Sequence, residues 1–358
     1  MVSGVEPSPA SAERAAAAVP DRPLASLFVT GFNQADTIRE ALEAALAQTW
    51  RPLDLLFSDD ASEDGTFEIM REVAERHQGR EAEGLSVRVR RSTVNGGIID
   101  NVNRVMEAAQ GELIVMAGGD DVSAPHRVVR LVEAWEGSGR GAHLLHSAAA
   151  VIDVGGRPTG ARRSAHPALL AARSPAEVLA SPRTALGATM AWTRALFDRF
   201  GPLPREALVE DPLLTLRASL LGPIVYVDEP LVSWREGGVS WTPPRVSARE
   251  RLYGAPLRLA RWRSAACRAF LKDLERLGGP DRDAARDLAS AQADHLGLQV
   301  DLADAGRIGR LALLPRALAA ALRTGSSRPA KLALQYLFDA PYMRLRDGRG
   351  GAHLETRS

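Results

Sequence analysis

Acidic and polar side chains follow several short apolar runs in this chain, and they are its best candidates for chemistry. Two adjacent carboxylates, Asp120 and Asp121, come directly after the apolar run 113–117. Neighbouring carboxylates repel each other, and a bound divalent cation such as Mg²⁺ or Mn²⁺, which prefers oxygen ligands, relieves that repulsion. Gly118 and Gly119 leave room for a ligand close to the backbone. A polar turn whose aspartate caps the next helix would explain the same residues.

Polar residues also follow three other apolar runs. Asp60 comes after the run 53–58, Asn95 comes shortly after the run 85–90, and further polar residues end the run 24–30. The carboxyl ends of parallel strands meet at one rim of a sheet, which is where such sheets bind ligands. A turn with a capping aspartate remains the alternative for Asp60. The candidate binding residues at this rim are Thr30, Phe32, Asn33, Asp60, Asn95, Gly97 and Asp120.

A second acidic pair, Glu210 and Asp211, begins a predicted helix over 210–221 and is followed by Pro212. A carboxylate at the mouth of a cleft can take a proton from a hydroxyl nucleophile, so a member of this pair is a candidate general base. The helix dipole alone favours acidic residues at this position, so a purely structural role is the alternative.

The elements that must position these residues alternate between strands and helices. Strands are predicted over 24–30, 53–58, 85–90, 113–117, 143–154, 189–192 and 224–227, and a short apolar run follows at 231–234. Helices are predicted over 37–48, 67–77, 98–109, 128–135, 195–200 and 210–221. This alternation indicates an α/β domain with a mainly parallel sheet. The segment 162–182 carries no clear period and is expected to be an irregular loop.

The chain divides into four predicted parts. Residues 1–23 and 346–358 are expected to be disordered tails, 24–242 the catalytic domain, and 243–345 a helical region packed on it. Arginines alternate with Leu, Trp and Phe from residue 257 to residue 270, so contact with an anionic membrane is the alternative for that region. No signal sequence is evident, and we expect a cytoplasmic protein, with peripheral contact at the inner face of the plasma membrane as the alternative.

Composition excludes several classes of protein. The 358 residues are 45% hydrophobic and 25% charged, as in soluble globular proteins. A formal charge of +1 gives no overall field that attracts nucleic acid. Cys267 is the only cysteine, which excludes an intrachain disulfide and a cysteine zinc cluster. The chain has neither a G-x-G-x-x-G motif after the first strand nor a G-x-x-x-x-G-K motif, which argues against dinucleotide oxidoreductases and P-loop nucleotidases.

The combined motifs resemble the family 2 glycosyltransferases. They are Thr30-Gly31-Phe32-Asn33, the string from Asp59 to Thr66, Asn95-Gly96-Gly97, Asp120-Asp121, Glu210-Asp211 and Ser233-Trp234-Arg235. The resemblance covers roughly 24–241 and implies the GT-A fold, a doubly wound and mainly parallel sheet with helices on both faces, here followed by a helical appendage. It also implies a UDP-, GDP- or TDP-linked sugar donor and a glycan, lipid-linked or small-molecule acceptor in bacterial glycan biosynthesis.

The resemblance assigns a role to each matching position. Thr30 and Phe32 would hold the base and ribose of the donor, with Asn33, Asn95 and Gly97 in the same pocket, and Asp60 would bond the base. Asp120 would contact the ribose and the metal, Asp121 would bind Mn²⁺ or Mg²⁺ at the diphosphate, and Asp211 would be the catalytic base of an inverting transfer.

Three departures from the family pattern bear on function. Gly119 stands where the family often has an acidic residue, and the loop 236–238 lacks the histidine of some members, so the metal-ligand set is reduced. The Gln-x-x-Arg-Trp signature of processive synthases is absent, which favours transfer of one or a few sugars. A sugar-phosphate nucleotidyltransferase is an alternative, although 31–34 lack the basic residues that hold a triphosphate. A sugar-nucleotide-binding protein without turnover is the third interpretation.

Overall fold

The computed structural model describes residues 22–237, 254–278, 282–324 and 328–337. Residues 1–21 of the predicted N-terminal tail, the predicted tail 346–358 and the end of the predicted catalytic domain, 238–242, lie outside these ranges. The division into a catalytic domain and an appendage therefore stays a prediction. Among the described helices, none is both long enough and apolar enough to cross a membrane.

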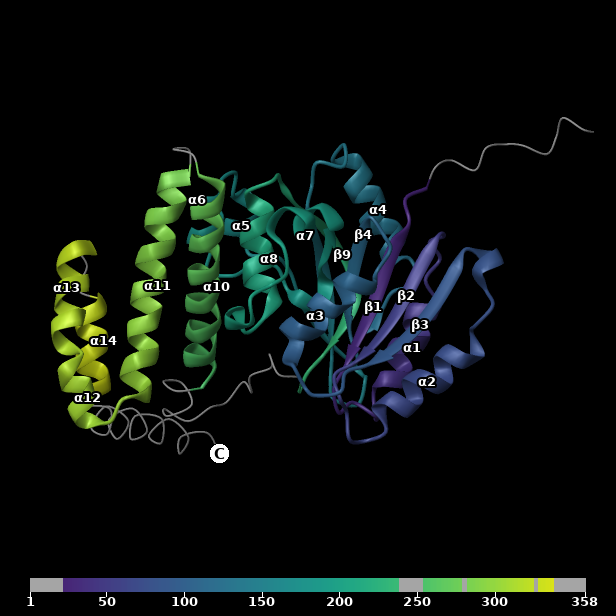
Figure 1. The fold of residues 1–358 in the computed structure, drawn as a ribbon, viewed down its shortest axis with the longest axis horizontal. Coiled ribbons are helices and arrows are strands. Elements are labelled where there is room, and N and C mark those ends of the chain that lie inside the picture. Colours follow the sequence, from purple (N-terminus) through teal and green to yellow (C-terminus); the bar gives the residue numbers. More distant parts are fainter. Residues whose placement is uncertain (1–21, 238–253, 279–281, 325–327, 338–358) are drawn as a thin grey trace, which may run out of the picture.

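Strands and helices alternate through the first two thirds of the chain, and helices alone follow (Figure 1). The strands are β1 (Ala25–Gly31), β2 (Leu53–Asp59), β3 (Leu85–Arg91), β4 (Leu113–Gly118), β5 (Val122–Ser123), β6 (Leu144–Ile152), β7 (Pro158–Arg163), β8 (Ala191–Thr193) and β9 (Ile224–Arg235). The helices are α1 (Ile38–Leu46), α2 (Thr66–Arg76), α3 (Gly97–Ala108), α4 (Arg127–Gly137), α5 (Pro167–Ala171), α6 (Pro175–Ala180), α7 (Arg194–Phe200), α8 (Glu210–Ser219), α10 (Ala255–Leu277), α11 (Asp283–Asp304), α12 (Arg307–Ala312), α13 (Leu314–Thr324) and α14 (Arg328–Leu337).

The strands form one sheet in the order β3-β2-β1-β4-β8-β6-β9-β5, with β7 paired to β6. The first four strands of the chain are mutually parallel, and β6 is parallel to β9. Strand β8 joins these two groups by antiparallel pairing to β4 and β6. The carboxyl ends of β1, β2 and β4 consequently lie side by side at one rim.

Both faces of the sheet are covered by helices because successive side chains of a strand point to opposite faces. In β1, Leu27 and Val29 share a core with residues of α1, α2 and α4, whereas Phe28 belongs to a second core with residues of α3, α8 and α10. This explains why buried strands such as β1 and β2 are almost continuously apolar. The predicted α/β fold with helices on both faces is confirmed.

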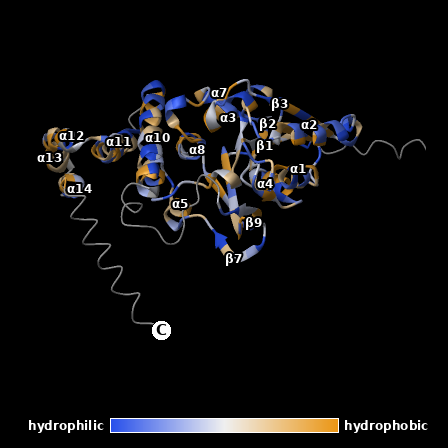
Figure 2. Cartoon of the chain, turned by 90° about the horizontal axis from the view of Figure 1, so that it is seen from below, coloured by the Kyte–Doolittle hydropathy of each residue, from blue (hydrophilic) through white to orange (hydrophobic). Residues whose placement is uncertain are grey.

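Helix α10 is part of the second core rather than a loosely attached element. Phe270 and Leu274 of α10 share that core with Trp192, and Arg217 of α8 forms a buried ion pair with Asp273 at 2.8 Å. Helix α11 packs on α10 and α6, and α12–α14 lie beyond it at the end of the molecule farthest from β3 (Figures 1 and 2). The helical prediction for this region is therefore correct in the parts that the structure describes.

The arginines that suggested a membrane surface are engaged in the fold. Arg263 donates to the main-chain oxygens of Pro182 at 2.8 Å and Ser181 at 3.0 Å. Arg261 forms an ion pair with Asp304. These contacts favour the packing interpretation of α10 over the membrane interpretation.

The segment 162–182 differs from its prediction as an irregular loop. It contains the end of β7 and the short helices α5 and α6. Both helices begin with proline at an N-terminal position, and Ser174 caps α6 by accepting a hydrogen bond from the Glu177 N–H at 3.3 Å. The Ser-Pro-x-Glu pattern is typical of a helix N-terminus. Helices of five or six residues are, however, too short to show the helical spacing of apolar residues in the sequence.

Candidate functional site

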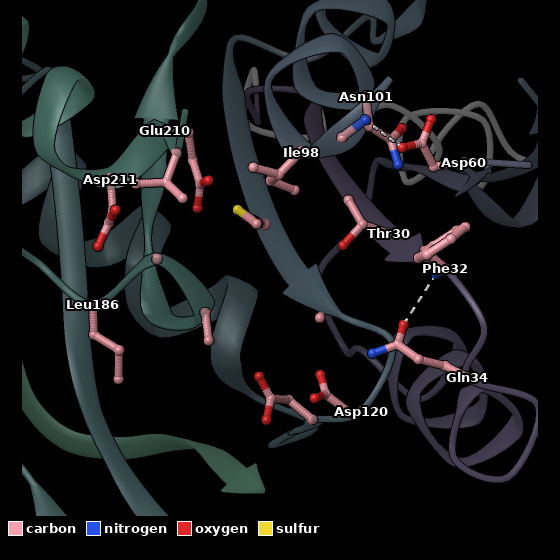
Figure 3. Close-up of a pocket in the computed structure, with 18 of the residues that line it drawn as sticks. Thr30, Phe32, Gln34, Asp60, Ile98, Asn101, Asp120, Leu186, Glu210 and Asp211 are labelled. Carbon is pink, nitrogen blue, oxygen red and sulfur yellow. Dashed lines mark hydrogen bonds between the residues drawn. The ribbon is translucent and has the colours of Figure 1, made fainter. Parts of the chain in front are cut away.

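A cleft of about 490 Å³ opens beyond the carboxyl ends of β1, β2 and β4 (Figure 3). Figure 3 shows Thr30, Phe32 and Asp60 on one side, Glu210 and Asp211 on the opposite side, and Asp120 between them at the base of the view. The predicted residues that line the cleft are Thr30, Phe32, Asp60, Asn95, Gly97, Asp120, Asp121 and Asp211. The structure thus brings together all of the predicted site residues except Asn33.

Asn33 ties two loops together instead of lining the cleft. Its side-chain oxygen accepts a hydrogen bond from the Glu63 N–H at 2.9 Å, and its own N–H donates to the Ser62 hydroxyl at 3.0 Å. Its φ of 52° lies in the left-handed region, which asparagine tolerates better than most residues. Asn33 thus supports the loop that carries Phe32, whose side chain is exposed, and its predicted place in the donor pocket stays a prediction.

Asp60 is buried and oriented by the start of α3. Its two carboxylate oxygens accept hydrogen bonds from the N–H groups of Gly96 at 3.1 Å and Gly97 at 2.7 Å. Asp60 therefore caps a helix, as the alternative interpretation predicted. The helix is α3, which follows β3, and not α2, which follows the strand β2 next to Asp60. Each carboxylate oxygen has a second lone pair, so Asp60 can still accept a hydrogen bond from a ligand in the cleft.

Asp120 and Asp121 form an acidic pair around Gly118. A Cβ atom at Gly118 would lie 2.9 Å from Oδ1 of Asp120 and 3.0 Å from Oδ2 of Asp121, so both carboxylates turn toward the same small residue. Burial raises the pKa of Asp120. Burial and the adjacent charge of Asp120 raise the pKa of Asp121 to about 7. Ionisation of both carboxylates therefore destabilises the folded protein, and a bound cation would offset that cost.

Gly119 has no space for a side chain. A Cβ atom there would lie 2.7 Å from the main-chain oxygen of Thr30 and 2.7 Å from Cδ1 of Ile38. Both distances are far below van der Waals contact, and the Thr30 oxygen belongs to a buried strand. The additional acidic residue that relatives often carry at this position would therefore require the β1 and β4 ends to separate.

Arg235, at the end of β9, binds the main chain beside the acidic pair. Its N–H donates to Oδ1 of Asp121 at 2.9 Å, and its guanidinium donates to the Asp120 carbonyl at 2.7 Å and to Glu40 at 2.6 Å. The guanidinium lines the cleft. It supplies a fixed positive charge where an anionic ligand would lie next to the two aspartates.

The acidic pair suits a divalent cation that takes its other ligands from elsewhere. Among the described residues, no three His, Cys, Asp or Glu side chains gather as a metal site. Mg²⁺ is commonly held by only one or two carboxylates together with substrate phosphates and water. Two converging carboxylates with raised pKa values match that arrangement, whereas they do not form a closed structural site.

Glu210 and Asp211 sit at the start of α8 and have different surroundings. Figure 3 shows the Glu210 carboxylate turned toward the interior of the cleft and the Asp211 carboxylate turned away from Asp60. Burial raises the pKa of Glu210 to about 6. Burial and the charge of Glu210 raise the pKa of Asp211 well above its usual range. Both groups are proton acceptors of increased basicity, as general bases require.

The loop before α8 is anchored to α3. Asn103 exchanges two hydrogen bonds of 2.8 Å with the main chain of Leu203, and Arg205 binds both oxygens of Asp100 at 2.8 and 2.6 Å. These contacts set where α8 begins and hence where Asp211 lies. They join residues about one hundred positions apart, so local sequence patterns could not reveal them.

Several residues of the cleft were not among the sequence-based candidates. Gln34 accepts a hydrogen bond from the Phe32 N–H at 3.4 Å. Burial raises the pKa of Asp120, and the interaction of the Gln34 side chain with this carboxylate opposes that increase. Trp262 reaches the cleft from α10. The position of Trp262 among arginines indicated an amphipathic helix, but the sequence pattern did not indicate that this side chain would line the cleft.

The comparisons with known proteins agree with this geometry. The family model described as Glycosyl transferase family 2 matches residues 26–166. The protein named "Putative glycosyltransferase EpsE", from Bacillus subtilis, is 28% identical over 110 residues, which are 31% of this chain and 37% of that protein. The uncharacterised protein Mb1547 of Mycobacterium bovis is 37% identical over 97 residues, 27% of this chain and 26% of that protein. The matched segment thus spans well under half the length of these relatives.

A solved structure extends the likeness to most of the chain. TarS of S. aureus, crystallised in complex with UDP-GlcNAc, superposes with a TM-score of 0.51 over 87% of this chain and 91% of that one, at 17% identity. At that identity the likeness establishes the fold. Fold and cleft together define an α/β protein of the GT-A class. Residues 26–166 match glycosyltransferase family 2, the family that the sequence motifs resemble.

Proposed function

We propose that this protein is an inverting, metal-dependent glycosyltransferase that transfers one or a few sugars from a nucleoside-diphosphate donor to an acceptor hydroxyl. The observation that carries the proposal is one cleft lined by an acidic pair, Asp120 and Asp121, and by a second acidic pair, Glu210 and Asp211, on the wall opposite Asp60. The first pair suits a cation at the diphosphate, and the second suits proton removal from the acceptor.

The donor nucleoside would lie on the Thr30 side of the cleft. Asp60, fixed by two main-chain N–H groups, presents free lone pairs to an N–H of the base. The ring of Phe32 is 44% exposed and can stack against a planar base. Thr30 lies at the end of β1 between them and Gly118, within the cleft.

The diphosphate would lie toward Asp120 and Asp121, which would hold Mn²⁺ or Mg²⁺. The cation, when bound, neutralises charge that develops on the leaving diphosphate. Asp120 and Asp121 orient their carboxylates toward Gly118, where a side chain would collide with both. The guanidinium of Arg235 adds a permanent positive charge at the same end of the cleft.

Asp211 would act as the general base. It lines this cleft and also a neighbouring one, so its carboxylate can meet an acceptor that enters from the second cleft. Glu210 lines only the first of these two clefts and raises the pKa of Asp211 through its charge. In a single displacement, Asp211 removes the acceptor proton as the oxygen attacks the anomeric carbon and the diphosphate leaves with the bonding electrons.

Two alternatives predict different outcomes. A nucleotidyltransferase would bind a nucleoside triphosphate and a sugar phosphate, and the β1–α1 loop 31–34 offers no basic side chain for the triphosphate. A binding protein without turnover would bind the donor but never hydrolyse or transfer it. The missing Gln-x-x-Arg-Trp motif supports transfer of one or a few sugars over processive synthesis.

The first test is donor binding. Calorimetry with UDP, GDP and TDP, each with Mn²⁺ and then with EDTA, should show binding of at least one nucleotide that weakens when the metal is removed. Failure of all three nucleotides to bind below millimolar concentration would remove the donor site. Binding that is unaffected by EDTA would remove the metal dependence.

The second test is replacement of the base. Asp211→Asn keeps the shape of the side chain but removes the proton acceptor, and turnover should fall by about 10²–10⁴-fold. Donor affinity should change little, because the base contacts the acceptor. Glu210→Gln is the matched control and should be much milder. Near-normal turnover of a folded Asp211→Asn variant would show that another group removes the proton.

A further inference from the structure

A second cleft, of about 360 Å³, adjoins the proposed donor cleft and is rich in arginine. The two clefts share Leu186, Asp211 and Trp262 as lining residues. Figure 3 shows Asp211 and Leu186 on the side of the donor cleft that lies opposite Asp60. A molecule bound in the second cleft would therefore approach the proposed base from the side away from the nucleoside.

The walls of the second cleft come from segments that are far apart in the chain. His146 lies on β6, Arg163 ends β7, Arg183 follows α6, and α10 contributes Arg258 and Arg263. Among the described residues that line it, Asp211 is the only acidic one. The cleft thus carries an excess of positive charge in a protein whose formal charge is only +1.

Two of these arginines face the cleft without a carboxylate partner. Among the described residues, neither Arg163 nor Arg183 forms an ion pair within 4.0 Å. Burial, and next the like charge of Arg183, lower the pKa of Arg163, and the charge of Glu236 opposes this to a smaller extent. The protein therefore holds two guanidinium groups close enough to repel each other, a cost that an anionic ligand would offset.

The surrounding structure keeps the two arginines in place. The Arg163 guanidinium stacks on the Trp234 ring at 3.8 Å from the ring centroid, and Trp234 also lines the donor cleft. Arg263 binds the main-chain oxygens of Leu179, Ser181 and Pro182, which fixes the segment that carries Arg183. These contacts fix the Arg163 side chain and the main chain that carries Arg183, whose own side chain is exposed.

Buried polar atoms in the cleft also lack partners. Within the described part of the chain, Nε2 of His146 and Nε of Arg163 are buried and have no hydrogen-bond partner. The His146 side chain is 2% exposed, and burial lowers its pKa to about 4, so it is neutral at physiological pH. Unsatisfied buried polar atoms are uncommon in folded proteins, and each calls for a bound water, an ion or a functional role as its explanation.

We propose that the second cleft is the acceptor site and that the acceptor carries an oxyanion, a phosphate or a carboxylate, which Arg163 and Arg183 bind beside Asp211. The inference rests on the proposed glycosyltransferase function, because it assigns Asp211 to the acceptor. Guanidinium groups match both oxyanions through paired N–H donors. The cleft volume of about 360 Å³ lies in the range of sites for small ligands and would hold the charged unit and the attacking hydroxyl.

The test is calorimetry of the full chain with four probes. Glycerol 3-phosphate represents a phosphate acceptor and glucuronate a carboxylate acceptor, and glycerol and glucose are their uncharged counterparts. At least one charged probe should bind more tightly than its uncharged counterpart, and the stronger of the two charged probes identifies the oxyanion. Equal binding of charged and uncharged probes would overturn the proposal.

Variants of the two arginines locate the binding. Arg183→Gln and Arg163→Gln should each weaken the charged probe about tenfold or more, the usual effect of losing a hydrogen bond between charged groups. Arg199→Gln, an exposed arginine on α7 that lines neither of these two clefts, is the matched control and should change nothing. Unchanged affinity in Arg183→Gln, whose exposed side chain is not needed for folding, would refute the site.

UDP titrations separate this inference from the proposed function. If Arg183→Gln weakens the binding of UDP as much as the binding of the charged probe, the arginines bind the donor diphosphate and the acceptor assignment is wrong. If charged probes bind as expected but no nucleotide binds to the wild type, the donor proposal fails while the anion site remains. If UDP binds and no charged probe does, the second cleft does not recognise an anion.

Discussion

Removing the charge of Asp121 should stabilise the metal-free protein, and more so at higher pH. The folded protein raises the pKa of Asp121 from 3.8 to about 7, because the carboxylate is buried beside Asp120. The native state therefore binds more protons than the unfolded state between about pH 4 and pH 7, and the stability that Asp121 contributes is lost as the pH rises through that window. Asp121→Asn keeps an oxygen that can accept the Arg235 N–H but cannot ionise.

The size of the effect follows from the shift. One pKa unit corresponds to about 1.4 kcal/mol, so a shift of roughly three units gives at most about 4 kcal/mol, and about half of that is expected because Asp120 titrates with it. The Tm of Asp121→Asn should exceed that of the wild type by about 3 °C at pH 8 in EDTA. The difference should disappear near pH 4.

The assay is thermal unfolding followed by circular dichroism from pH 4 to pH 8, with the exposed Asp198→Asn as the control. Mn²⁺ at about one hundred times its dissociation constant should raise wild-type stability by about 2.7 kcal/mol at pH 8 and have little effect on Asp121→Asn. A difference between variant and wild type that stays constant with pH would refute the electrostatic argument. Equal stabilisation of both proteins by Mn²⁺ would show that Asp121 does not hold the cation.

Two further changes test the packing around the site. Gly119→Ala should lower the free energy of unfolding, measured in urea, by about 1–3 kcal/mol, because its Cβ would press on the Thr30 carbonyl. Gly137→Ala on α4, which has open space around it, is the control and should be neutral or stabilising. Equal effects of the two changes would contradict the close approach at Gly119. Asp273→Asn should lower the free energy of unfolding by about 3–5 kcal/mol, because it leaves the buried Arg217 charge without its partner. A single unfolding transition would show that α10 unfolds together with the sheet. Separate transitions would contradict a shared core.

The order of elements and the rim of the sheet were predictable from local sequence patterns. Apolar runs separated by helical periods indicated parallel strands, and the residues that end those strands had to meet at one edge, since parallel strands share a direction. Thr30, Asp60 and Asp120 therefore came together as expected. The resemblance to family 2 glycosyltransferases rested partly on the same strand ends, and the family match of residues 26–166 covers those ends but not the motifs at 210–211 and 233–235.

Side-chain direction within those loops was not predictable. Asn33 follows β1 as expected, yet its left-handed φ turns its side chain to the β2–α2 loop instead of the cleft. Whether Glu210 or Asp211 would face an acceptor also depended on where α8 begins. That position is set by the contacts of Asn103 and Arg205 across about one hundred residues of sequence, and no local period carries such information.

The sequence by itself determined the fold class and the residues at the strand ends, because both follow from the local alternation of apolar and polar positions. Tertiary structure decided which distant segments complete the site. Arg235 meets Asp121 across 114 positions, Trp262 reaches the cleft from a helix that appeared to be an appendage, and Arg163 and Arg183 form a wall of the second cleft. These meetings result from the packing of helices and strands on a common core, which depends on the whole chain at once and leaves no signature in the spacing of neighbouring residues.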